Sequence, residues 1–541
     1  MKSKRLTLSV LFVVAAVANA LACTNLIVGK NASADGSTIV SYSADSYGLF
    51  GELYHYPAGM HKKGTLIDIH EWDTGKYLGQ IEQARQTYNV IGNMNEFQLT
   101  IGETTFGGRP ELVDTTGIID YGSLIYLGLQ RSRTAREAIK VMTELVQEYG
   151  YYSSGESFTI ADPNEIWIME MIGKGPGVRG AVWVAVRVPD DCISAHANQS
   201  RIHQFNMNDK ENCMYSPDVI SFAREKGYFD GVNKDFSFAD AYAPLDFGAR
   251  RYCEARVWSY FNMFTDRGNE FLPYILGETD TPMPLFVKPN RKVSVQDVKN
   301  AMRDHYEGTP LDISKDFGAG PYHTPYRLSP LSFKVGDREY FNERPISTQQ
   351  SGFVFVAQMR SELPDPIGGV LWFGTDDANM TVFTPVYCCT DKVPVCYTRV
   401  DGADYITFSW NSAFWIFNWV ANMVYPRYDL MMGDVRATQT ELETTFNEAQ
   451  EGVEAAAAKL LEKDPAKAKA FLTNYTNMTA QSTFDTWKRL GEFLVVKYND
   501  GVVKRMKNGQ FERNSIGQPA GVIRPGYPKE FLEEYVKQTG D

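Results

Sequence analysis

Cys23 is the residue whose position most clearly suggests chemistry, because the three residues before it form a cleavage site. Ala20-Leu21-Ala22 fits the small-x-small pattern of a signal-peptide cleavage site. Cleavage after Ala22 leaves Cys23 first in the mature chain, so one residue carries both a thiol and a free α-amine. The pKa of an α-amine is ~7.7–8.0 and that of a free thiol is ~8.5. The two groups can share a proton near neutral pH, which predicts a nucleophile that carries its own base.

Residues 1–22 have the parts of an export signal. Lys2, Lys4 and Arg5 form a basic start, and the apolar run that follows is shorter than the ~20 residues that span a bilayer. An uncleaved anchor and a lipoprotein signal remain alternatives. Lipoprotein processing also leaves a first cysteine, but it prefers a large aliphatic residue where Ala20 stands, and lipidation would consume the thiol. We expect a periplasmic or secreted protein whose mature form has no membrane span.

Composition limits the classes of partner. The chain has 541 residues and a formal net charge of −12, with 43% hydrophobic and 22% charged residues, as in ordinary globular proteins. An acidic chain without a basic run argues against nucleic acid and anionic membrane surfaces as partners. Seven cysteines are too few for a disulfide scaffold, although some could pair in an exported protein.

Other motifs carry little chemistry. Residues 175–180, Gly-Pro-Gly-Val-Arg-Gly, fit G-x-G-x-x-G, but a strand follows them where a dinucleotide site needs a helix, so they predict a hairpin loop. The histidines are dispersed and no Cys-x-x-Cys is present, so we expect no metal and no cofactor. His196 and His203 are candidates for the base of a papain-like Cys-His pair. That pair needs a cysteine at a helix start, whereas Cys23 precedes a strand, which favours a structural or substrate-lining role for His196.

The elements around Cys23 are predicted to be strands. Residues 24–29 and 38–43 form apolar runs separated by an Asp35-Gly36 turn, which predicts a hairpin with Cys23 at its free end. Two helices are expected at 120–130 and 134–149, the second with Thr134 as N-cap and Glu137 completing a capping box. A further helix is expected at 293–306. Further strands are expected at 157–161, 166–172, 181–188, 192–197, 353–358, 369–373 and 381–385.

This order of strands, helices and strands predicts an α+β fold in which helices cover antiparallel sheet. The composition changes near residue 425. Residues 435–463 are rich in Glu, Ala and Gln, and Asp464-Pro465 begins a new helix, with another reaching Tyr498. We therefore expect a signal peptide (1–22), a catalytic domain (23–425), a helical appendage (426–500) and a C-terminal tail (501–541).

Several stretches together resemble the amino end and body of the dipeptidase A family of cysteine peptidases. That family has the N-terminal nucleophile hydrolase fold and is related to penicillin V acylases and bile salt hydrolases. The resemblance spans roughly residues 23–500. The stretches that carry it are 23–30 (CTNLIVGK), 32–38 (ASADGST), 94–96 (MNE), 103–106 (ETTF), 194–202 (SAHANQSRI), 255–258 (ARVW) and 367–374 (IGGVLWFG).

The resemblance implies a four-layer αββα sandwich with Cys23 at the end of a central strand. It also implies catalytic roles at matching positions. These are Cys23 as nucleophile, Asp45 as the acid beside the α-amine, Asn198 as an oxyanion donor and Arg256 as a cation near the thiolate.

Three further residues are expected near the substrate. Thr105 falls where the acylases have a second asparagine, and His196 is expected to line the site. Tyr42 stands three residues before Asp45, where the wider superfamily has arginine. Whatever that arginine does must be supplied differently in this chain.

These residues predict an exported dipeptidase that forms a thioester on Cys23 and needs neither metal nor organic cofactor. The expected partner is a dipeptide or another small amide, and a homo-oligomer remains open. One alternative is a non-peptide amidase of the bile salt or penicillin V type. Another is a non-catalytic exported lipoprotein or binding protein.

Overall fold

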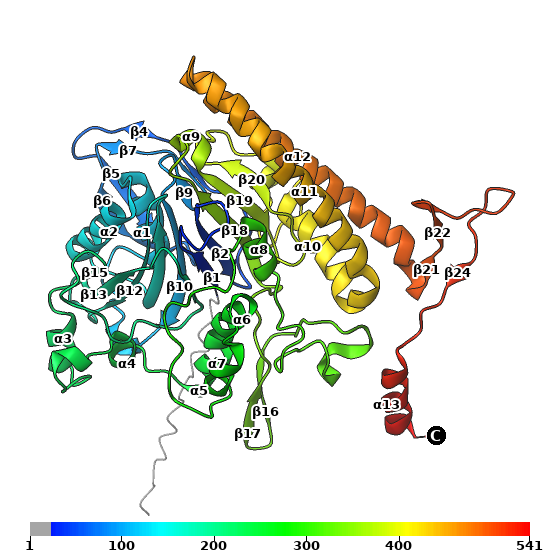
Figure 1. Ribbon diagram of the computed structural model, residues 1–541, viewed down its shortest axis with the longest axis horizontal. Coiled ribbons are helices and arrows are strands. Elements are labelled where there is room, and N and C mark those ends of the chain that lie inside the picture. Colours follow the sequence, from blue (N-terminus) through cyan, green and yellow to red (C-terminus); the bar gives the residue numbers. More distant parts are fainter. Residues whose placement is uncertain (1–22, 541) are drawn as a thin grey trace, which may run out of the picture.

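The computed structural model describes residues 23–540, so the expected signal segment lies outside the described residues. The molecule is a mixed α+β structure built on two antiparallel sheets (Figure 1). The first, called here the nucleophile sheet after the nucleophile expected at Cys23, contains in spatial order β14 (Ile193–His196), β1 (Asn25–Val28), β2 (Thr38–Asp45), β18 (Ser351–Met359), β19 (Val370–Thr375) and β20 (Thr384–Tyr387). The second, called the facing sheet, contains β15 (Cys213–Tyr215), β13 (Ala181–Arg187), β12 (Ile166–Gly173), β11 (Gly155–Ala161), β10 (Thr100–Gly107), β9 (Met94–Asn95), β8 (Val90–Ile91) and β3 (His55–Tyr56).

The hairpin predicted after Cys23 is confirmed. β1 and β2 pair antiparallel with Val28 opposite Ile39, and β1 lies between β2 and β14. Cys23 therefore lies just before β1, which is an interior strand of the sheet. The G-x-G-x-x-G stretch is also a hairpin loop, because it joins the antiparallel strands β12 and β13.

The two sheets pack face to face. The Asn25 side chain donates to the Glu103 carbonyl over 2.7 Å, and the Thr38 hydroxyl donates to the Asp162 carbonyl over 2.8 Å. Every residue of β2, β11 and β12 is buried, because each of these strands is covered on both faces. Polar side chains between the sheets must therefore find partners within the protein.

Two helices cover the outer face of the facing sheet, as predicted. α1 (Tyr121–Arg131) and α2 (Ala135–Tyr149) bury Leu124, Ile139 and Met142 in a core shared with that sheet. The Asp120 carboxylate caps α1, and the Thr134 hydroxyl accepts from the third residue of α2.

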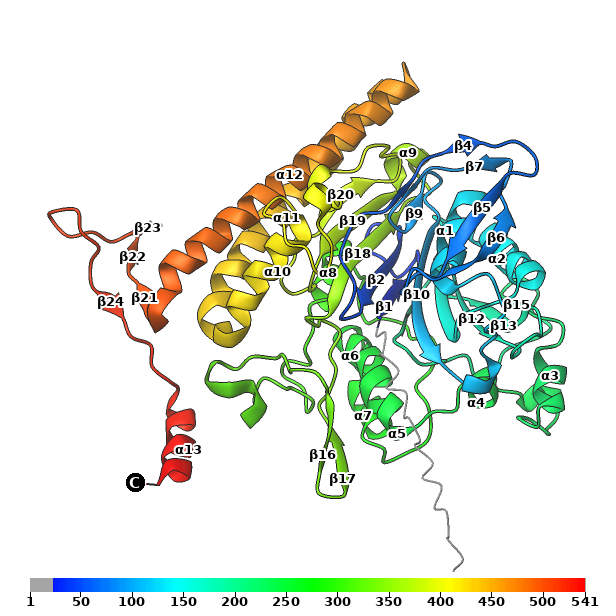
Figure 2. The same ribbon diagram turned by 180° about the vertical axis from the view of Figure 1, so that it is seen from behind.

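Five helices pack against the nucleophile sheet. They are α6 (Ala255–Phe264), α8 (Val295–Ala301), α10 (Ala413–Val424), α11 (Tyr428–Leu461) and α12 (Pro465–Tyr498). Figure 2 shows α10, α11 and α12 side by side next to β19 and β20. Residues 465–498 form one continuous helix capped by Asp464, where two helices were expected. α12 buries Trp487 and Leu494 in the core of the nucleophile sheet.

Two other expectations were wrong at their boundaries. The helix expected at 293–306 is confined to α8, and Tyr306 has a φ of 66°, which does not continue a right-handed helix. The strand expected at 381–385 begins only at Thr384. The carbonyl of Thr381 instead accepts hydrogen bonds from the side chains of Arg303 and Gln439, so it is not available to a ladder.

Shorter elements complete the chain. The helices are α3 (Val219–Glu225), α4 (Phe238–Tyr242), α5 (Phe247–Ala249), α7 (Gly268–Ile275), α9 (Asp365–Gly368) and α13 (Lys529–Thr539). The paired strands are β4 (Gly59–Met60) with β7 (Gln86–Thr87), β5 (Leu66–His70) with β6 (Tyr77–Glu82), β16 (Ser332–Val335) with β17 (Arg338–Phe341), β21 (Val503–Lys504) with β24 (Val522–Ile523), and β22 (Met506–Lys507) with β23 (Gln510–Phe511). Within residues 23–540, no helix has the length and apolarity to span a membrane. All seven cysteines are buried and unpaired in this part of the chain.

Candidate active site

Cys23 lies at the edge of the space between the two sheets. Its side chain is 4% exposed, and Sγ lies 3.7 Å from the Tyr42 hydroxyl. Burial raises the pKa of the Cys23 thiol well above its ordinary value, and the carboxylates of Glu103 and Asp45 raise it further. In the full-length chain, where the Cys23 nitrogen is an amide, the thiol is therefore held in its neutral form.

Asp45 ends β2 and is fully enclosed by donors. Its carboxylate accepts from the hydroxyl of Ser351 over 2.5 Å and from that of Ser43 over 2.9 Å, and it pairs with the Arg344 guanidinium over 2.5 Å. Burial raises the pKa of Asp45, while Arg344 and the two hydroxyls act in the opposite direction. Because breaking a buried ion pair is costly, this set holds the carboxylate in a fixed place.

Arg256, in the first turn of α6, ties together the backbone around the nucleophile. Its guanidinium donates to the Cys23 carbonyl over 2.7 Å and to the Thr24 hydroxyl over 2.8 Å. It also donates to the Ala197 carbonyl over 3.1 Å and to the Asn198 side-chain oxygen over 2.9 Å. The structure thus places the Arg256 cation against the backbone of Cys23 and beside the Asn198 amide side chain.

Asn198 follows β14 with a φ of 60°, a left-handed conformation that asparagine tolerates better than most residues. Its amide nitrogen donates to the Thr105 carbonyl over 2.8 Å. The Thr105 hydroxyl in turn donates to Glu156 over 2.8 Å. Asn198 therefore connects Arg256 on the nucleophile side with β10 of the facing sheet.

Tyr42 reaches across to a pair of buried acids. Its hydroxyl donates to Glu103 over 2.6 Å, and Glu103 lies beside Glu156 on neighbouring strands β10 and β11. Burial raises the pKa of both carboxyls, and that of Glu156 rises well above the ordinary value, with Glu103 contributing to the shift. Burial and their mutual repulsion therefore disfavour a negative charge on both carboxyls at once, and disfavour it most at Glu156.

His196 joins the two sheets, which is the structural one of the two roles considered for it. Its two ring nitrogens bond to the hydroxyls of Thr104 over 2.7 Å and Thr159 over 2.6 Å, and its side chain is completely buried. Burial and the charge of Arg201 lower the pKa of His196 to about 3, so the ring is neutral. Both ring nitrogens join the two sheets, which leaves neither of them for a substrate.

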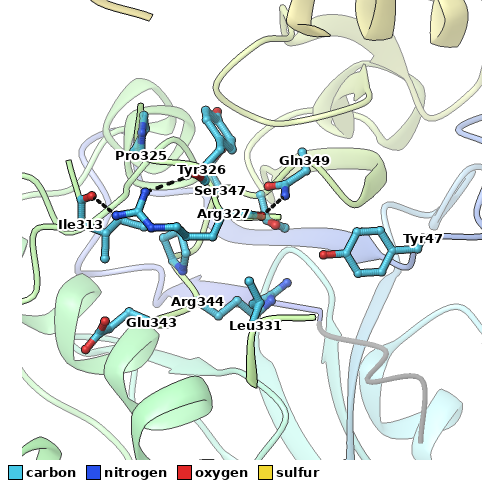
Figure 3. A pocket seen from close by; sticks show the side chains of 12 residues that line it. Tyr47, Ile313, Pro325, Tyr326, Arg327, Leu331, Glu343, Arg344, Ser347 and Gln349 are labelled. Atoms are coloured by element: carbon cyan, nitrogen blue, oxygen red, sulfur yellow. Dashed lines mark hydrogen bonds between the residues drawn. The ribbon is translucent and has the colours of Figure 1, made fainter. Parts of the chain in front are cut away.

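A small cavity adjoins the acid. Figure 3 shows Tyr47, Arg327 and Arg344 among the side chains that line it. Arg344 forms an ion pair with Asp45, so the same side chain lines the cavity and contacts the Asp45 carboxylate. In the described part of the chain, no cluster of His, Cys, Asp or Glu side chains is arranged to hold a metal ion.

Three charged residues around this site were not predicted from the sequence. Glu103 and Glu156 are acids inside strands that are otherwise apolar or small, which is a signal that was available. Arg344 lies 299 positions from Asp45 in a loop before β18, and no local pattern marks it.

The comparisons with known proteins agree on one family. The model of peptidase family C69 matches residues 22–55 and 50–441. The chain is 30% identical over 387 residues to a probable dipeptidase of Salmonella dublin, covering 68% of this chain and 81% of that protein. It is 25% identical over 416 residues to dipeptidase A of Lactobacillus helveticus, covering 73% of this chain and 80% of the relative. It is also 26% identical over 474 residues to a probable dipeptidase of Latilactobacillus sakei, with coverage of 84% and 90%.

Proposed function

Since the chain belongs to peptidase family C69, we propose that it is an exported cysteine dipeptidase whose mature form begins at Cys23. The observation that carries this assignment is the position of Cys23. Cys23 precedes an interior strand and lies near Asp45, whose carboxylate accepts several hydrogen bonds. The Arg256 guanidinium donates to the backbone carbonyl of Cys23. The dipeptidase names of the relatives support the substrate class.

The arrangement of layers supports the N-terminal nucleophile hydrolase fold for this chain. Helices α1 and α2 cover one sheet, the other sheet carries the nucleophile, and a second set of helices covers its outer face. This is the order expected for a four-layer αββα sandwich. In such a fold the nucleophile is the first residue of the mature chain, which agrees with the cleavage site before Cys23.

The proposed reaction is acyl transfer in two steps. The Cys23 α-amine takes the thiol proton, Sγ attacks the carbonyl carbon of the peptide bond, and Asn198 stabilises the oxyanion. The protonated amine then gives its proton to the leaving nitrogen, the C–N bond breaks, and a thioester remains. Water, deprotonated by the same amine, attacks the thioester and releases the acid and the thiol.

Cleavage of the Ala22–Cys23 bond is the activating step in this scheme. Before cleavage the nitrogen of Cys23 is an amide without a basic lone pair, and burial raises the pKa of the thiol. After cleavage the new ammonium group stands next to Sγ and near Asp45. That positive charge favours the thiolate, which the buried thiol otherwise resists.

The test is processing and hydrolysis measured together. The protein is produced with residues 1–22 in an exporting host, its amino terminus is sequenced, and it is assayed on a panel of dipeptides. We expect Cys23 at the amino terminus, hydrolysis of dipeptides, no activity in Cys23→Ala and at most weak activity in Cys23→Ser. Cys213→Ala, a buried cysteine on β15 remote from the site, is the matched control and is expected to keep its activity.

Two outcomes would assign a different function. A lipidated or blocked Cys23 would remove the amine base and favour an exported lipoprotein or binding protein. Hydrolysis of conjugated bile salts or penicillin V, without hydrolysis of dipeptides, would favour a non-peptide amidase. Full activity in Cys23→Ala would contradict the nucleophile itself.

A further inference from the structure

The acids next to the nucleophile have no role in the mechanism above. Tyr42 touches both Cys23 Sγ and Glu103, so the Glu103 oxygen that it bonds lies no farther from Sγ than the sum of those two contacts, 3.7 Å and 2.6 Å. Glu103 and Glu156 are 1% and 0% exposed. Burying two acids beside a reactive sulfur costs folding free energy, and such buried ionisable groups are common at functional sites.

Within residues 23–540, no side-chain cation neutralises the charge on this pair. Among residues 23–540, no lysine or arginine forms an ion pair with Glu103 or Glu156. Arg344 is paired with Asp45, and Arg256 faces the backbone oxygen of Cys23. One Glu103 oxygen and one Glu156 oxygen lack a donor from any other kind of side chain. Two carboxyls in contact favour one negative charge over two, and Tyr42 lies between that charge and Sγ.

A dipeptide carries a cation at the matching position. Its α-ammonium nitrogen is two bonds from the scissile carbonyl carbon, a separation of about 2.5 Å from standard bond lengths. In a near-attack geometry that carbon lies about 3–3.5 Å from the attacking atom. The ammonium group of a bound dipeptide therefore falls within about 6 Å of Sγ, which is the distance range of the acid pair.

We propose that Glu103, supported by Glu156 and Tyr42, binds the free α-ammonium of the substrate. This inference rests on the proposed dipeptidase function and deepens it, because it names the residues that select a free amino terminus. The bound ammonium also places a positive charge beside Cys23, where Glu103 alone disfavours the thiolate. Substrate binding and activation of the nucleophile are coupled in this way.

The inference excludes N-acylated substrates. Conjugated bile salts and penicillin V have no ammonium group beside the scissile carbonyl, so they would leave the buried acid pair without a partner. A site built around a polar contact rejects analogues that lack it far more strongly than an apolar pocket rejects a smaller group. The acid pair thus favours peptides with a free amino end over the amides of the related acylases.

The experiment uses two substrates that differ in one group. Alanyl-alanine and propionyl-alanine have the same scissile bond and the same carboxylate, but only the first has an ammonium group. For the mature wild-type enzyme we expect kcat/KM to favour alanyl-alanine by at least about 100-fold. In Glu103→Gln we expect this ratio to fall below about tenfold, with most of the loss on alanyl-alanine.

Two further variants separate binding from folding. In Glu156→Gln, the new amide group can still donate a hydrogen bond to Glu103. The ratio of kcat/KM on alanyl-alanine to kcat/KM on propionyl-alanine is therefore expected to persist. Glu165→Gln, in the same sheet at the β11–β12 turn, is the matched control and is expected to keep both rates. Circular dichroism melting of each variant shows whether it is folded, and Glu103→Asp replaces Glu103→Gln if the latter does not fold.

The outcomes are distinct from those for the proposed function. Equal hydrolysis of the two substrates by wild type, or an unchanged ratio in Glu103→Gln, would overturn the role of Glu103 while leaving the dipeptidase intact. Equal losses on both substrates in Glu103→Gln would assign Glu103 a merely structural role. Failure of the wild type to cleave any dipeptide would instead contradict the proposed function.

Discussion

Arg256 joins oxygen atoms from separate parts of the chain, and at the scale of single residues it is the point on which the site depends. It bonds the carbonyl of Cys23 on one side and the side chain of Asn198 on the other. A lysine has the same charge but lacks the planar fork that reaches several acceptors at once. One guanidinium therefore sets the relative positions of Cys23 and Asn198, the proposed nucleophile and oxyanion donor.

Arg256→Lys tests that role. Because small misplacements of reacting groups can cost about 100-fold in rate, we expect kcat to fall by about that factor while KM changes by only a few-fold. The split is measured by steady-state kinetics on a dipeptide. Arg267→Lys, an exposed residue paired with Glu270, is the control. An unchanged kcat in Arg256→Lys would show that the guanidinium does not position the site.

His196 predicts how stability depends on pH. Its pKa is about 3 in the folded chain and about 6.5 when unfolded. Between these values the unfolded state binds the extra proton, so stability falls as pH falls below 6.5, by about 1.4 kcal/mol per unit. At pH 5 the loss is about 2 kcal/mol. His196→Gln removes this loss, which urea unfolding at pH 5 and pH 7.5 measures. An equal fall in both proteins would contradict the buried neutral ring.

The sequence was informative about residues that lie within short motifs. Cys23, Asp45, Asn198 and Arg256 lie in or near stretches that resemble a known family, and the structure brings all four together. Arg344 could not be predicted, because its contact with Asp45 depends on how a distant loop packs. The pairing of Glu103 with Glu156 likewise depends on strand neighbours, which local pattern does not specify.

At the scale of elements, local sequence signals predicted that a helix or strand exists better than they predicted the residues at which it begins and ends. The cap predicted at Thr134 is confirmed at the start of α2, and Asp120 caps α1 in the same way, because a capping side chain acts on its own first turn. The end of α8 and the start of β20 depend on contacts from other parts of the chain, such as the side chain of Gln439 on the Thr381 carbonyl. Tertiary contacts overrode local preference at both places.

The packing of α12 against α10 predicts how Gly→Ala substitutions in the long helices change stability, with open helical positions as controls. A Cβ added at Gly491 would lie 2.2 Å from the ring of Trp419, whereas one added at Gly433 or Gly452 in α11 would meet nothing within 4 Å. Gly491→Ala is expected to destabilise the protein by about 1–3 kcal/mol through overpacking. Gly433→Ala and Gly452→Ala are expected to stabilise it by up to about 1 kcal/mol. Thermal melting measures all three, and stabilisation by Gly491→Ala would contradict the close contact.

At the scale of the whole molecule, the last two long helices and the tail behave differently. α11 and α12 bury Val435, Phe446 and Trp487 in the core that lies on the nucleophile sheet. No residue from 502 to 540 is buried, although the Phe511 ring stacks on Phe493. The composition change near residue 425 therefore marks helices that complete the core, while the chain after α12 lies on the surface.

Two truncations test this division. Ending the chain at residue 501 removes no buried residue and, at the core, only the packing of the half-buried Val503, so we expect the melting temperature to shift by a few degrees and hydrolysis to be kept. Ending it at residue 425 exposes the face of the sheet that α11 and α12 cover. Since losing one large core side chain costs about 3–5 kcal/mol, losing many exceeds the total stability of about 5–15 kcal/mol. We therefore expect the shorter chain to be insoluble or unfolded, as judged by gel filtration and circular dichroism. A folded, active chain ending at 425 would show instead that residues 426–500 are a true appendage, as their composition alone predicts.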